Sequence, residues 1–205
     1  MAEKIYHYPL WIRIWHWINA LACIVLIPTG LIMQYASQDF MLLSFETAVT
    51  VHNMAGMILV ISYPVFFFGN LFGKNGAYYK MNLRKIWRQM MQQIRYYIYG
   101  VFKGEHPPFP INENRKFNPL QKFTYVVTMF ILYPILMLTG LALLFPEVIV
   151  SQVGGYSGTF LTALLHTAMG FLVSLFIVIH IYFATMGVTP KSNFRSMVNG
   201  WTEPH

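Results

Sequence analysis

Four long runs without a charged residue constrain this chain more than any other feature. They lie between Arg13 and Asp39, between Glu46 and Lys74, between Lys122 and Glu147, and between Glu147 and Lys191. Each of the first three is long enough for one helix across a bilayer, which needs about 20 apolar residues. The fourth run is longer, and its Gly-rich polar part, Ser151 to Thr159, predicts a loop before a single helix.

These runs predict an all-α, integral membrane four-helix bundle. Backbone groups in lipid must be hydrogen-bonded within their own segment, so helices are expected rather than open strands. The expected spans are residues 12–35, 47–72, 122–146 and 160–187 of one membrane domain, 1–205. The first run is longer than the apolar region of a signal peptide, so we expect it to remain as a span.

The basic residues predict the orientation. All 14 Lys and Arg lie in the N-terminal tail, in the segment from Lys74 to Lys122, or in the C-terminal tail. The loops around Asp39 and Glu147 carry acidic residues and no basic ones. Because basic loops stay in the cytoplasm, both termini are expected there. No nucleic-acid recognition motif accompanies the positive charge, so we expect no nucleic-acid partner and contact with membrane lipid instead.

The basic segment has its own periodicity. Hydrophobic residues recur at three- and four-residue steps from Leu83 to Val101, with Arg and Lys between them. This pattern predicts an amphipathic helix over about residues 80–102. Two interpretations stay open: the helix lies on the cytoplasmic membrane surface, or it packs against the bundle or a partner. Prolines between 107 and 119 then predict an extended loop.

Four of the seven histidines lie inside the expected spans, namely His16, His52, His166 and His180. Ionisable residues within a membrane are rare and indicate function, although a single His can simply hydrogen-bond a neighbouring helix. His52 and His166 are expected near the outer ends of their helices, and the other two toward the inner ends. His166 and His180 face one side of their helix, separated by about 21 Å.

Two facing imidazoles in a helical bundle are the arrangement that ligates a haem iron from both sides. We therefore predict two b-type haems, the outer one held by His52 and His166 and the inner one by His16 and His180. Gly56 and Gly170 follow two of these histidines by one turn, which leaves room for a macrocycle edge or allows close helix contact.

Non-haem sites built from four histidines remain an alternative. Zinc or copper would need the ligands clustered, and the spacing of His166 and His180 argues against that. Cys23 is the only cysteine, so no internal disulfide forms. The chain also lacks the Cys-x-x-Cys-His motif of covalently attached haem.

Several segments resemble the four-helix di-haem cytochrome b subunits of bacterial formate dehydrogenases, nickel-iron hydrogenases and thiosulfate reductases. They are WIRIWHWINA with His16, TVHNMAG with His52, LLHTAMGFLVSLFIVIH with His166 and His180, NPLQKFTY, and the terminal MVNGWTE. The last two are most similar to the thiosulfate-reductase-like branch. The resemblance implies a multi-pass protein of the bacterial cytoplasmic (inner) membrane and the same pairing of haem ligands.

The resemblance also implies a quinone site near the start of the third span. Formate dehydrogenase members carry Asn-Ala-Gly-Gln-Lys there. Asn118, Gln121 and Lys122 match this motif, whereas Pro119 and Leu120 replace its middle residues. Menaquinone or ubiquinone is the expected substrate, with His106 or Glu113 as candidate proton relays. The bland alternative is that Asn118 caps the helix and that Gln121 and Lys122 form a solvated first turn.

The expected role is electron transfer between an external-side redox subunit and the quinone pool, with no catalytic side chain in the short outer loops. That partner would be an iron–sulfur or molybdenum enzyme, a hydrogenase or a multi-haem cytochrome c. Two other classes stay open: a self-contained di-haem oxidoreductase, of ferric reductase or quinol–superoxide type, and a haem-free membrane anchor of a redox enzyme.

Overall fold

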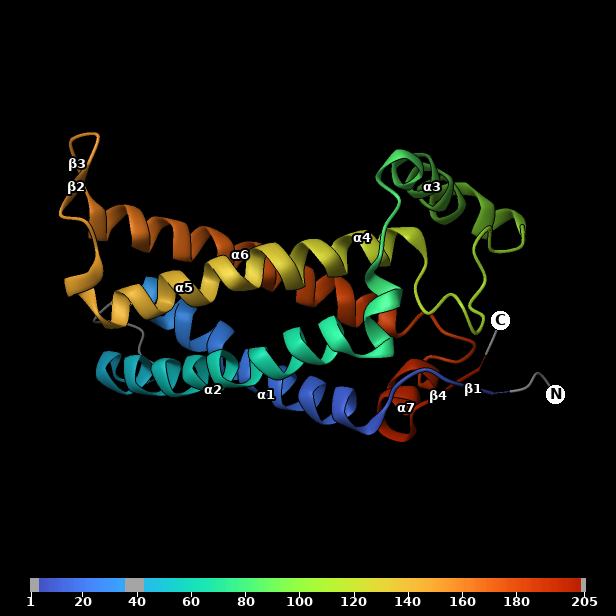
Figure 1. Ribbon diagram of the computed structural model, residues 1–205, viewed down its shortest axis with the longest axis horizontal. Helices are drawn as coiled ribbons and strands as arrows, with labels where there is room; N and C mark the ends of the chain where they lie inside the picture. Colours follow the sequence, from blue (N-terminus) through green and yellow to red (C-terminus); the bar gives the residue numbers. More distant parts are fainter. Residues whose placement is uncertain (1–3, 36–42, 204–205) are drawn as a thin grey trace. The chain divides into compact units, whose positions relative to one another are not determined.

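A computed structural model describes residues 4–35 and 43–203 of the chain. Within them, four helical segments are long and apolar enough to cross a membrane (Figure 1). They are α1 (Leu10–Gln34), α2 (Phe45–Phe72), the third span Pro119–Leu144, and α6 (Gly158–Ala184). The predicted all-α membrane fold is therefore confirmed, and the helix ends lie within a few residues of those expected. Asp39, expected in the first outer loop, lies outside the described residues.

The third span is not a uniform helix. It consists of α4 (Pro119–Val127), a π-helical turn η4 (Thr128–Leu132) and α5 (Tyr133–Leu144). Pro134 lies at the start of α5. A proline inside a helix lacks an N–H and displaces the carbonyl four residues earlier, here that of Phe130, so the wider turn accommodates it.

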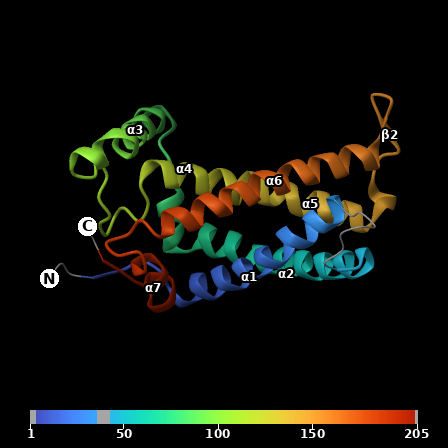
Figure 2. The same ribbon diagram turned by 180° about the vertical axis from the view of Figure 1, so that it is seen from behind.

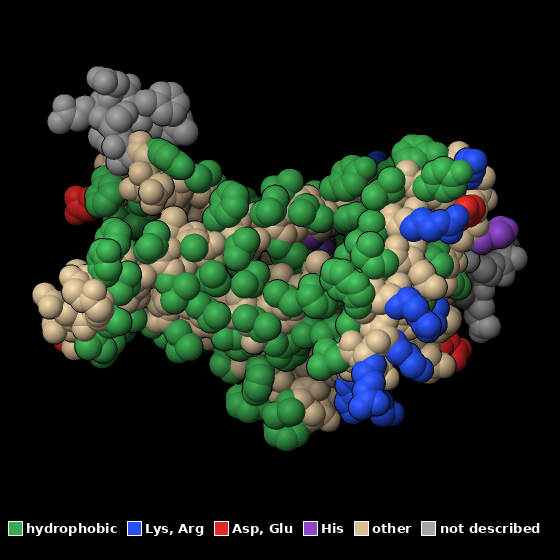
Figure 3. All heavy atoms as spheres, turned by 90° about the horizontal axis from the view of Figure 1, so that it is seen from above, with side chains coloured by type: hydrophobic (Ala, Val, Ile, Leu, Met, Phe, Trp, Pro, Cys, Tyr) green, Lys and Arg blue, Asp and Glu red, His purple; other side chains and the backbone are tan. Residues whose placement is uncertain are grey.

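The chain forms two compact units. Unit 1 contains Met1–Arg13, Phe68–Phe130 and Phe176–His205, and unit 2 contains Ile14–Phe67 and Ile131–Leu175. All 14 Lys and Arg belong to unit 1, and none belongs to unit 2. Figure 3 shows basic side chains gathered together and hydrophobic side chains covering the helices. By the positive-inside rule, unit 1 carries the cytoplasmic residues.

Unit 2 is a bundle of parts of all four spans (Figure 2). Side-chain contacts link neighbouring helices within it. The Trp15 indole on α1 donates a hydrogen bond to the Ser62 carbonyl on α2 (3.1 Å) and stacks on Phe66 (ring centroids 4.4 Å apart). Cys23 on α1 and the Tyr133 hydroxyl on α5 share a hydrogen bond of 3.1 Å. These contacts bury polar groups only as pairs, as an apolar bundle requires.

The outer connection of unit 2 is more ordered than the predicted loop. A 3-10 turn, η5 (Pro146–Val148), precedes a hairpin of β2 (Gln152–Val153) and β3 (Tyr156–Ser157). Gly154 and Gly155 join the strands with φ angles of 58° and 84°. Two positive φ angles match the turn that suits the right-handed twist of a hairpin, and glycine adopts them without strain.

Unit 1 joins the two ends of the chain. Strand β1 (Ile5–Tyr6) pairs antiparallel with β4 (Trp201–Thr202), next to α7 (Ser192–Asn199). The Arg13 guanidinium also donates to the Val198 carbonyl. A further 3-10 segment, η1 (Lys74–Tyr79), follows α2. These contacts hold the N-terminal strand and the C-terminal helix in one unit.

Helix α3 (Leu83–Arg95) continues into a π-helical turn η2 (Tyr96–Gly100) and a 3-10 turn η3 (Val101–Lys103). Its hydrophobic residues divide into two stripes. Ile86 and Met90 are buried where α3 packs against α4. Leu83, Trp87 and Ile98 instead are exposed. Both interpretations of the amphipathic pattern therefore have support: one stripe packs within unit 1, and the other suits a lipid surface.

Candidate functional site

His52 on α2 and His166 on α6 face each other within unit 2. Their ring centroids lie 6.4 Å apart, with an angle of 72° between the ring planes. A metal–imidazole bond is about 2 Å long, so two imidazoles that bracket one metal have ring centroids roughly 6 Å apart on that bond length. The two rings therefore have the separation that a shared iron requires.

The Nδ1 atoms of both rings are held by threonine hydroxyls. The Thr29 oxygen lies 3.0 Å from Nδ1 of His52 and donates its own hydrogen to the Val25 carbonyl at 2.7 Å. A hydroxyl has one hydrogen, so Thr29 accepts and the Nδ1 of His52 carries the proton. This leaves the Nε2 lone pair for a metal, because the hydrogen bond at one ring nitrogen determines which nitrogen is metallated.

The same arrangement occurs at His166. Its Nδ1 lies 3.0 Å from the Thr139 oxygen and 3.1 Å from the Leu136 carbonyl. The Thr139 hydroxyl donates to the Ile135 carbonyl at 2.7 Å. Nδ1 of His166 is therefore also a donor, and its Nε2 is also the unprotonated nitrogen. Neither threonine was singled out from the sequence.

A repeated sequence pattern accounts for this likeness. Leu26–Gly30 reads LIPTG and Leu136–Gly140 reads LMLTG, so both follow Leu-x-x-Thr-Gly. His52 and His166 each begin His-x-x-x-Gly. The two halves of unit 2 thus carry one repeated pattern, which could have been found by comparing the spans with one another.

The glycines of this pattern have two different roles. A Cβ at Gly30 would lie 3.4 Å from Cε1 of His52, and one at Gly140 would lie 3.0 Å from Cε1 of His166. These two glycines allow the rings to approach the opposite helix. At Gly56 and Gly170, a Cβ would meet only one leucine atom, at 4.0 Å and 3.8 Å respectively. Close helix contact therefore does not explain Gly56 and Gly170, and the open space fits the edge of a bulky group.

The other two membrane histidines belong to different units, and their pairing stays a prediction. His16 lies in unit 2 and packs against Trp17, with ring centroids 5.4 Å apart. His180 lies in unit 1, where its Nδ1 is 3.2 Å from the Tyr125 hydroxyl. Its ring also stacks on Phe176 at 5.7 Å. The contact of Nδ1 with Tyr125 again occupies the nitrogen that a metal would not use.

The three residues expected near a quinone start the third span. Asn118 and Gln121 form a reciprocal capping box, in which each side-chain oxygen accepts a hydrogen bond from the other residue's backbone N–H. The Asn118 amide also donates to the Tyr97 hydroxyl at 2.9 Å. The Lys122 ammonium donates to the Lys80 carbonyl at 3.4 Å. The capping interpretation thus describes Asn118 and Gln121, and a quinone role for the three remains a prediction.

Within residues 4–35 and 43–203, no three His, Cys, Asp or Glu side chains gather as a metal-ion site. His52 and His166 instead form a facing pair, an arrangement in which two imidazoles can bind one metal from opposite sides.

A family model described as prokaryotic cytochrome b561 matches residues 7–200. The chain is 37% identical over 200 residues to the Escherichia coli (strain K12) protein named "Putative cytochrome YdhU", covering 98% of this chain and 75% of that protein. No solved structure matches the chain significantly. The chain belongs to the prokaryotic cytochrome b561 family, whose members are b-type cytochromes of the bacterial inner membrane.

Proposed function

We propose that this chain is a di-haem b-type cytochrome subunit that carries electrons across the membrane between an external-side redox partner and the quinone pool. The observation that carries the proposal is the pair His52 and His166, with ring centroids 6.4 Å apart and Nδ1 atoms held by threonines. This arrangement leaves two unprotonated Nε2 atoms for one iron.

In this proposal His52 and His166 hold the outer haem, and His16 and His180 hold the inner one. When bound, each haem supplies a one-electron change at its iron. The chain's own residues hold the rings: Thr29 and Thr139 keep the protons on Nδ1, and Tyr125 contacts the corresponding nitrogen of His180. The apolar bundle excludes water from the ligands, which influences their redox potential.

The partner follows from what the outer side lacks. The described outer connection between α5 and α6 consists of a 3-10 turn and a hairpin whose two strands have two residues each. Such a short connection has no room for a catalytic site, so substrate chemistry belongs to a separate subunit. An iron–sulfur or molybdenum enzyme, a hydrogenase or a multi-haem cytochrome c would fill that role. The resemblance favours the thiosulfate-reductase-like branch.

On the cytoplasmic side, the proposal places menaquinone or ubiquinone near Asn118, Gln121 and Lys122. Donors beside a quinone carbonyl stabilise the negative charge that develops on reduction. The Asn118 amide and the Lys122 ammonium are such donors, and both currently contact protein oxygens. A quinone that binds here would have to take over one of these hydrogen bonds.

The test is spectroscopic. Protein purified in mild detergent from haem-sufficient cells should contain two b-type haems per chain, measured as the pyridine complex. Replacing His52 or His166 by Ala should remove one component of the reduced-minus-oxidised spectrum, and replacing His16 or His180 should remove the other. His106→Ala, in an exposed loop position, is the matched control and should keep both. A colourless preparation, or one haem that survives all four substitutions, would overturn the proposal.

A further inference from the structure

Lys116 is a lysine buried inside unit 1, although it comes from a basic cytoplasmic segment. Only 4% of its surface is exposed. Its ammonium donates a hydrogen bond to the Asn75 side-chain oxygen at 2.9 Å. It also lies over the Tyr8 ring, 4.2 Å from the ring centroid, with Tyr78 and Phe117 at 5.5 Å and 5.4 Å. Asn75 in turn donates to Asn70 at 2.6 Å.

Within the part of the chain that the structure describes, no carboxylate forms an ion pair with this ammonium. The ion pairs among the described residues of the chain join Lys4 to Glu203 and Arg95 to Glu105. One amide oxygen and aromatic faces compensate only part of the cost of burying a charge. Burial accordingly lowers the pKa of Lys116 to about 7. The charged and neutral forms of this side chain are therefore both accessible near neutral pH.

Other titratable groups surround Lys116. Burial raises the pKa of Tyr8 to about 12 and raises that of Tyr79 further. Burial, followed by repulsion from Lys116, lowers the pKa of His7. Tyr78, Glu113 and Arg115 are titratable side chains of the neighbouring segments, and Lys122 and Tyr125 are those of α4. Lys116 is thus the buried group of this cluster that titrates near pH 7.

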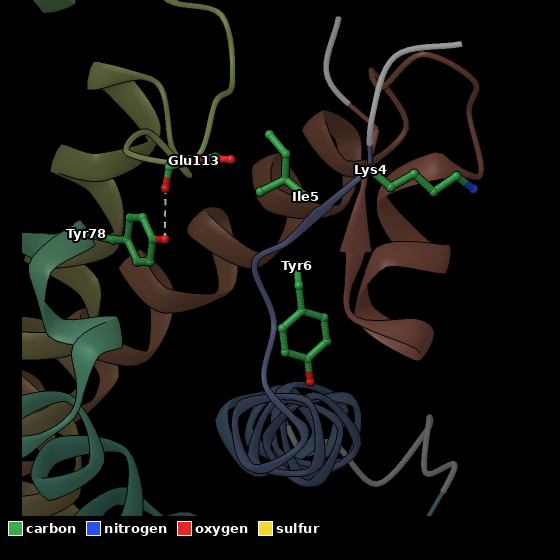
Figure 4. A pocket seen from close by; sticks show the side chains of 5 residues that line it. All are labelled: Lys4, Ile5, Tyr6, Tyr78 and Glu113. Atoms are coloured by element: carbon green, nitrogen blue, oxygen red, sulfur yellow. Dashed lines mark hydrogen bonds between the residues drawn. The ribbon is translucent and has the colours of Figure 1, made fainter.

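Tyr78 lies beside both Lys116 and a pocket. The Tyr78 ring contacts His7 edge-on, with centroids 5.8 Å apart, and its centroid lies 5.5 Å from the Lys116 ammonium. Tyr78 also lines a pocket of about 450 Å³ together with Lys4, Ile5, Tyr6 and Glu113. Figure 4 shows the Tyr78 hydroxyl, which donates to the Glu113 carbonyl at 3.1 Å, and the Lys4 side chain, which points away.

His7 contacts Tyr78, and one of its ring nitrogens makes no hydrogen bond to the described residues. Only 3% of its surface is exposed, and its Nε2 donates to the Asn112 carbonyl at 3.2 Å. Its Nδ1 is buried and has no hydrogen-bond partner among the described residues. A protonated Nε2 leaves Nδ1 as an acceptor. The cluster therefore offers a proton acceptor beside Tyr78.

In the other direction, contacts through Tyr125 and Phe117 link His180 to Lys116. Phe117 follows it in the chain, and the Phe117 ring packs edge-on against Tyr125 with centroids 4.9 Å apart. The Tyr125 hydroxyl is 3.2 Å from Nδ1 of His180. Both Lys116 and His180 belong to unit 1. A change of charge at a group held by His180 therefore acts on Lys116 through an interior of low dielectric, where charges interact strongly.

We propose that Lys116 is a proton-loading site, which takes up a proton from the cytoplasmic side when the haem held by His180 is reduced. This inference rests on the proposed function. A haem held by His180 would accept one electron from the external redox partner, one proton would move from solvent at the Tyr78 pocket to the neutral Lys116 amine, and no bond between heavier atoms would change. The added negative charge favours the ammonium form, and the proton compensates the electron's charge.

The alternative is that Lys116 is only a fixed cation that anchors Tyr8. Lys116→Met removes both the charge and the titration, whereas Lys116→Arg keeps a permanent cation, because arginine does not deprotonate in proteins. An anchoring role is therefore rescued by Arg, and a proton-loading role is not. Lys80→Met replaces an exposed lysine of the same unit and is the matched control.

The experiment measures proton uptake as the haems are reduced, in lightly buffered detergent solution near pH 7 with an indicator dye. Wild type and Lys80→Met should take up protons, and the midpoint potential of the inner component should fall as pH rises. Both Lys116 variants should lose most of this uptake while keeping both haems. Uptake that is unchanged in Lys116→Arg, with both haems present, overturns the inference. Absence of haem from the wild type would instead refute the proposed function.

Discussion

The Thr139 hydroxyl oxygen lies 3.0 Å from Nδ1 of His166, and the Thr29 hydroxyl stands in the same relation to His52. Both threonines use their single hydrogen on a carbonyl of their own helix, at 2.7 Å. They are therefore acceptors toward the imidazoles. Such a second contact orients a ligand and makes it a stronger electron donor to the metal.

Replacing Thr29 or Thr139 by Val should weaken the outer haem site. Valine keeps the shape of threonine but cannot accept the ring N–H. We expect haem affinity to fall by about tenfold, the lower end of the range for such contacts, because a backbone carbonyl remains near His166. The midpoint potential of the outer component should rise, since a weaker donor stabilises the oxidised iron less.

Thr162→Val is the control for that change. Thr162 lies on α6, the helix that carries His166, and its hydroxyl donates to the Gly158 carbonyl at 2.8 Å. Redox titration of all three variants should show a shifted outer component only for Thr29 and Thr139. Equal potentials in the three proteins would mean that these threonines are only helix residues.

Gly170→Ala should separate the two explanations of that glycine. The added methyl would meet only Leu136, at 3.8 Å, so the polypeptide can accommodate it. Alanine also favours a helix over glycine by about 1 kcal/mol. The haem-free protein should therefore be as stable as the wild type or more so, while its haem content should fall. Thermal unfolding of haem-free protein and pigment content per chain measure the two effects. If the variant binds its full complement of haem, the macrocycle does not occupy the space beside Gly170.

The sequence predicts the spans well because bilayer thickness and backbone satisfaction leave few choices for a long uncharged run. It also predicts that His52 and His166 meet, because topology alone places them at one depth. The contacts of Thr29 and Thr139 cannot be predicted from either helix alone, because each threonine binds a histidine of another helix. Only the comparison of Leu26–Gly30 with Leu136–Gly140 reveals their shared pattern.

The burial of Lys116 cannot be predicted from sequence patterns. Its basic neighbours predict a solvated cytoplasmic surface, whereas its burial depends on Tyr8 and Asn75, which are distant in sequence. The divided face of α3 is a similar case. One hydrophobic periodicity covered two stripes, and only packing against α4 determines that Ile86 and Met90 form the buried one.

Lys116 should make folding stability depend on pH. Its pKa is lowered from 10.5 to about 7 in the folded chain. Between these values the unfolded chain binds a proton that the folded chain does not, so the free energy of unfolding rises with pH across this window. Below about pH 7 Lys116 is protonated in both the folded and the unfolded chain. The cost of burying its charge then reaches its full value and no longer changes with pH. Lys116→Met should lack the rise, which is at most about 1.4 kcal/mol per pH unit.

Thermal unfolding in detergent between pH 6.5 and 9.5 measures this dependence. Subtracting the Lys116→Met curve from that of wild type removes the contribution of all other groups. Lys80→Met should follow the wild type, since Lys80 is exposed. Parallel curves for wild type and Lys116→Met would show that Lys116 keeps its charge throughout the range.

The orientation can be checked with reporter fusions. A fusion after Gly155, in the hairpin of unit 2, should report an external position, and one after Glu105, in unit 1, a cytoplasmic one. The expectation follows from the confinement of Lys and Arg to unit 1. A fusion after Gln38 should also be external. A cytoplasmic signal at Gly155 would contradict the expected orientation.

Asn118 offers the sharpest separation of a structural role from a quinone role. Asn118→Ala removes the helix cap and should cost about 1 kcal/mol of stability. Asn118→Asp keeps the acceptor oxygen that receives the Gln121 N–H, so it should restore that stability. Aspartate lacks the amide hydrogens that now contact Tyr97. If a quinone uses this amide as a donor, Asn118→Asp should be stable and hold both haems, yet turn over quinone poorly. Wild-type turnover in Asn118→Asp would confine Asn118 to its cap and move the quinone site elsewhere in the cytoplasmic half.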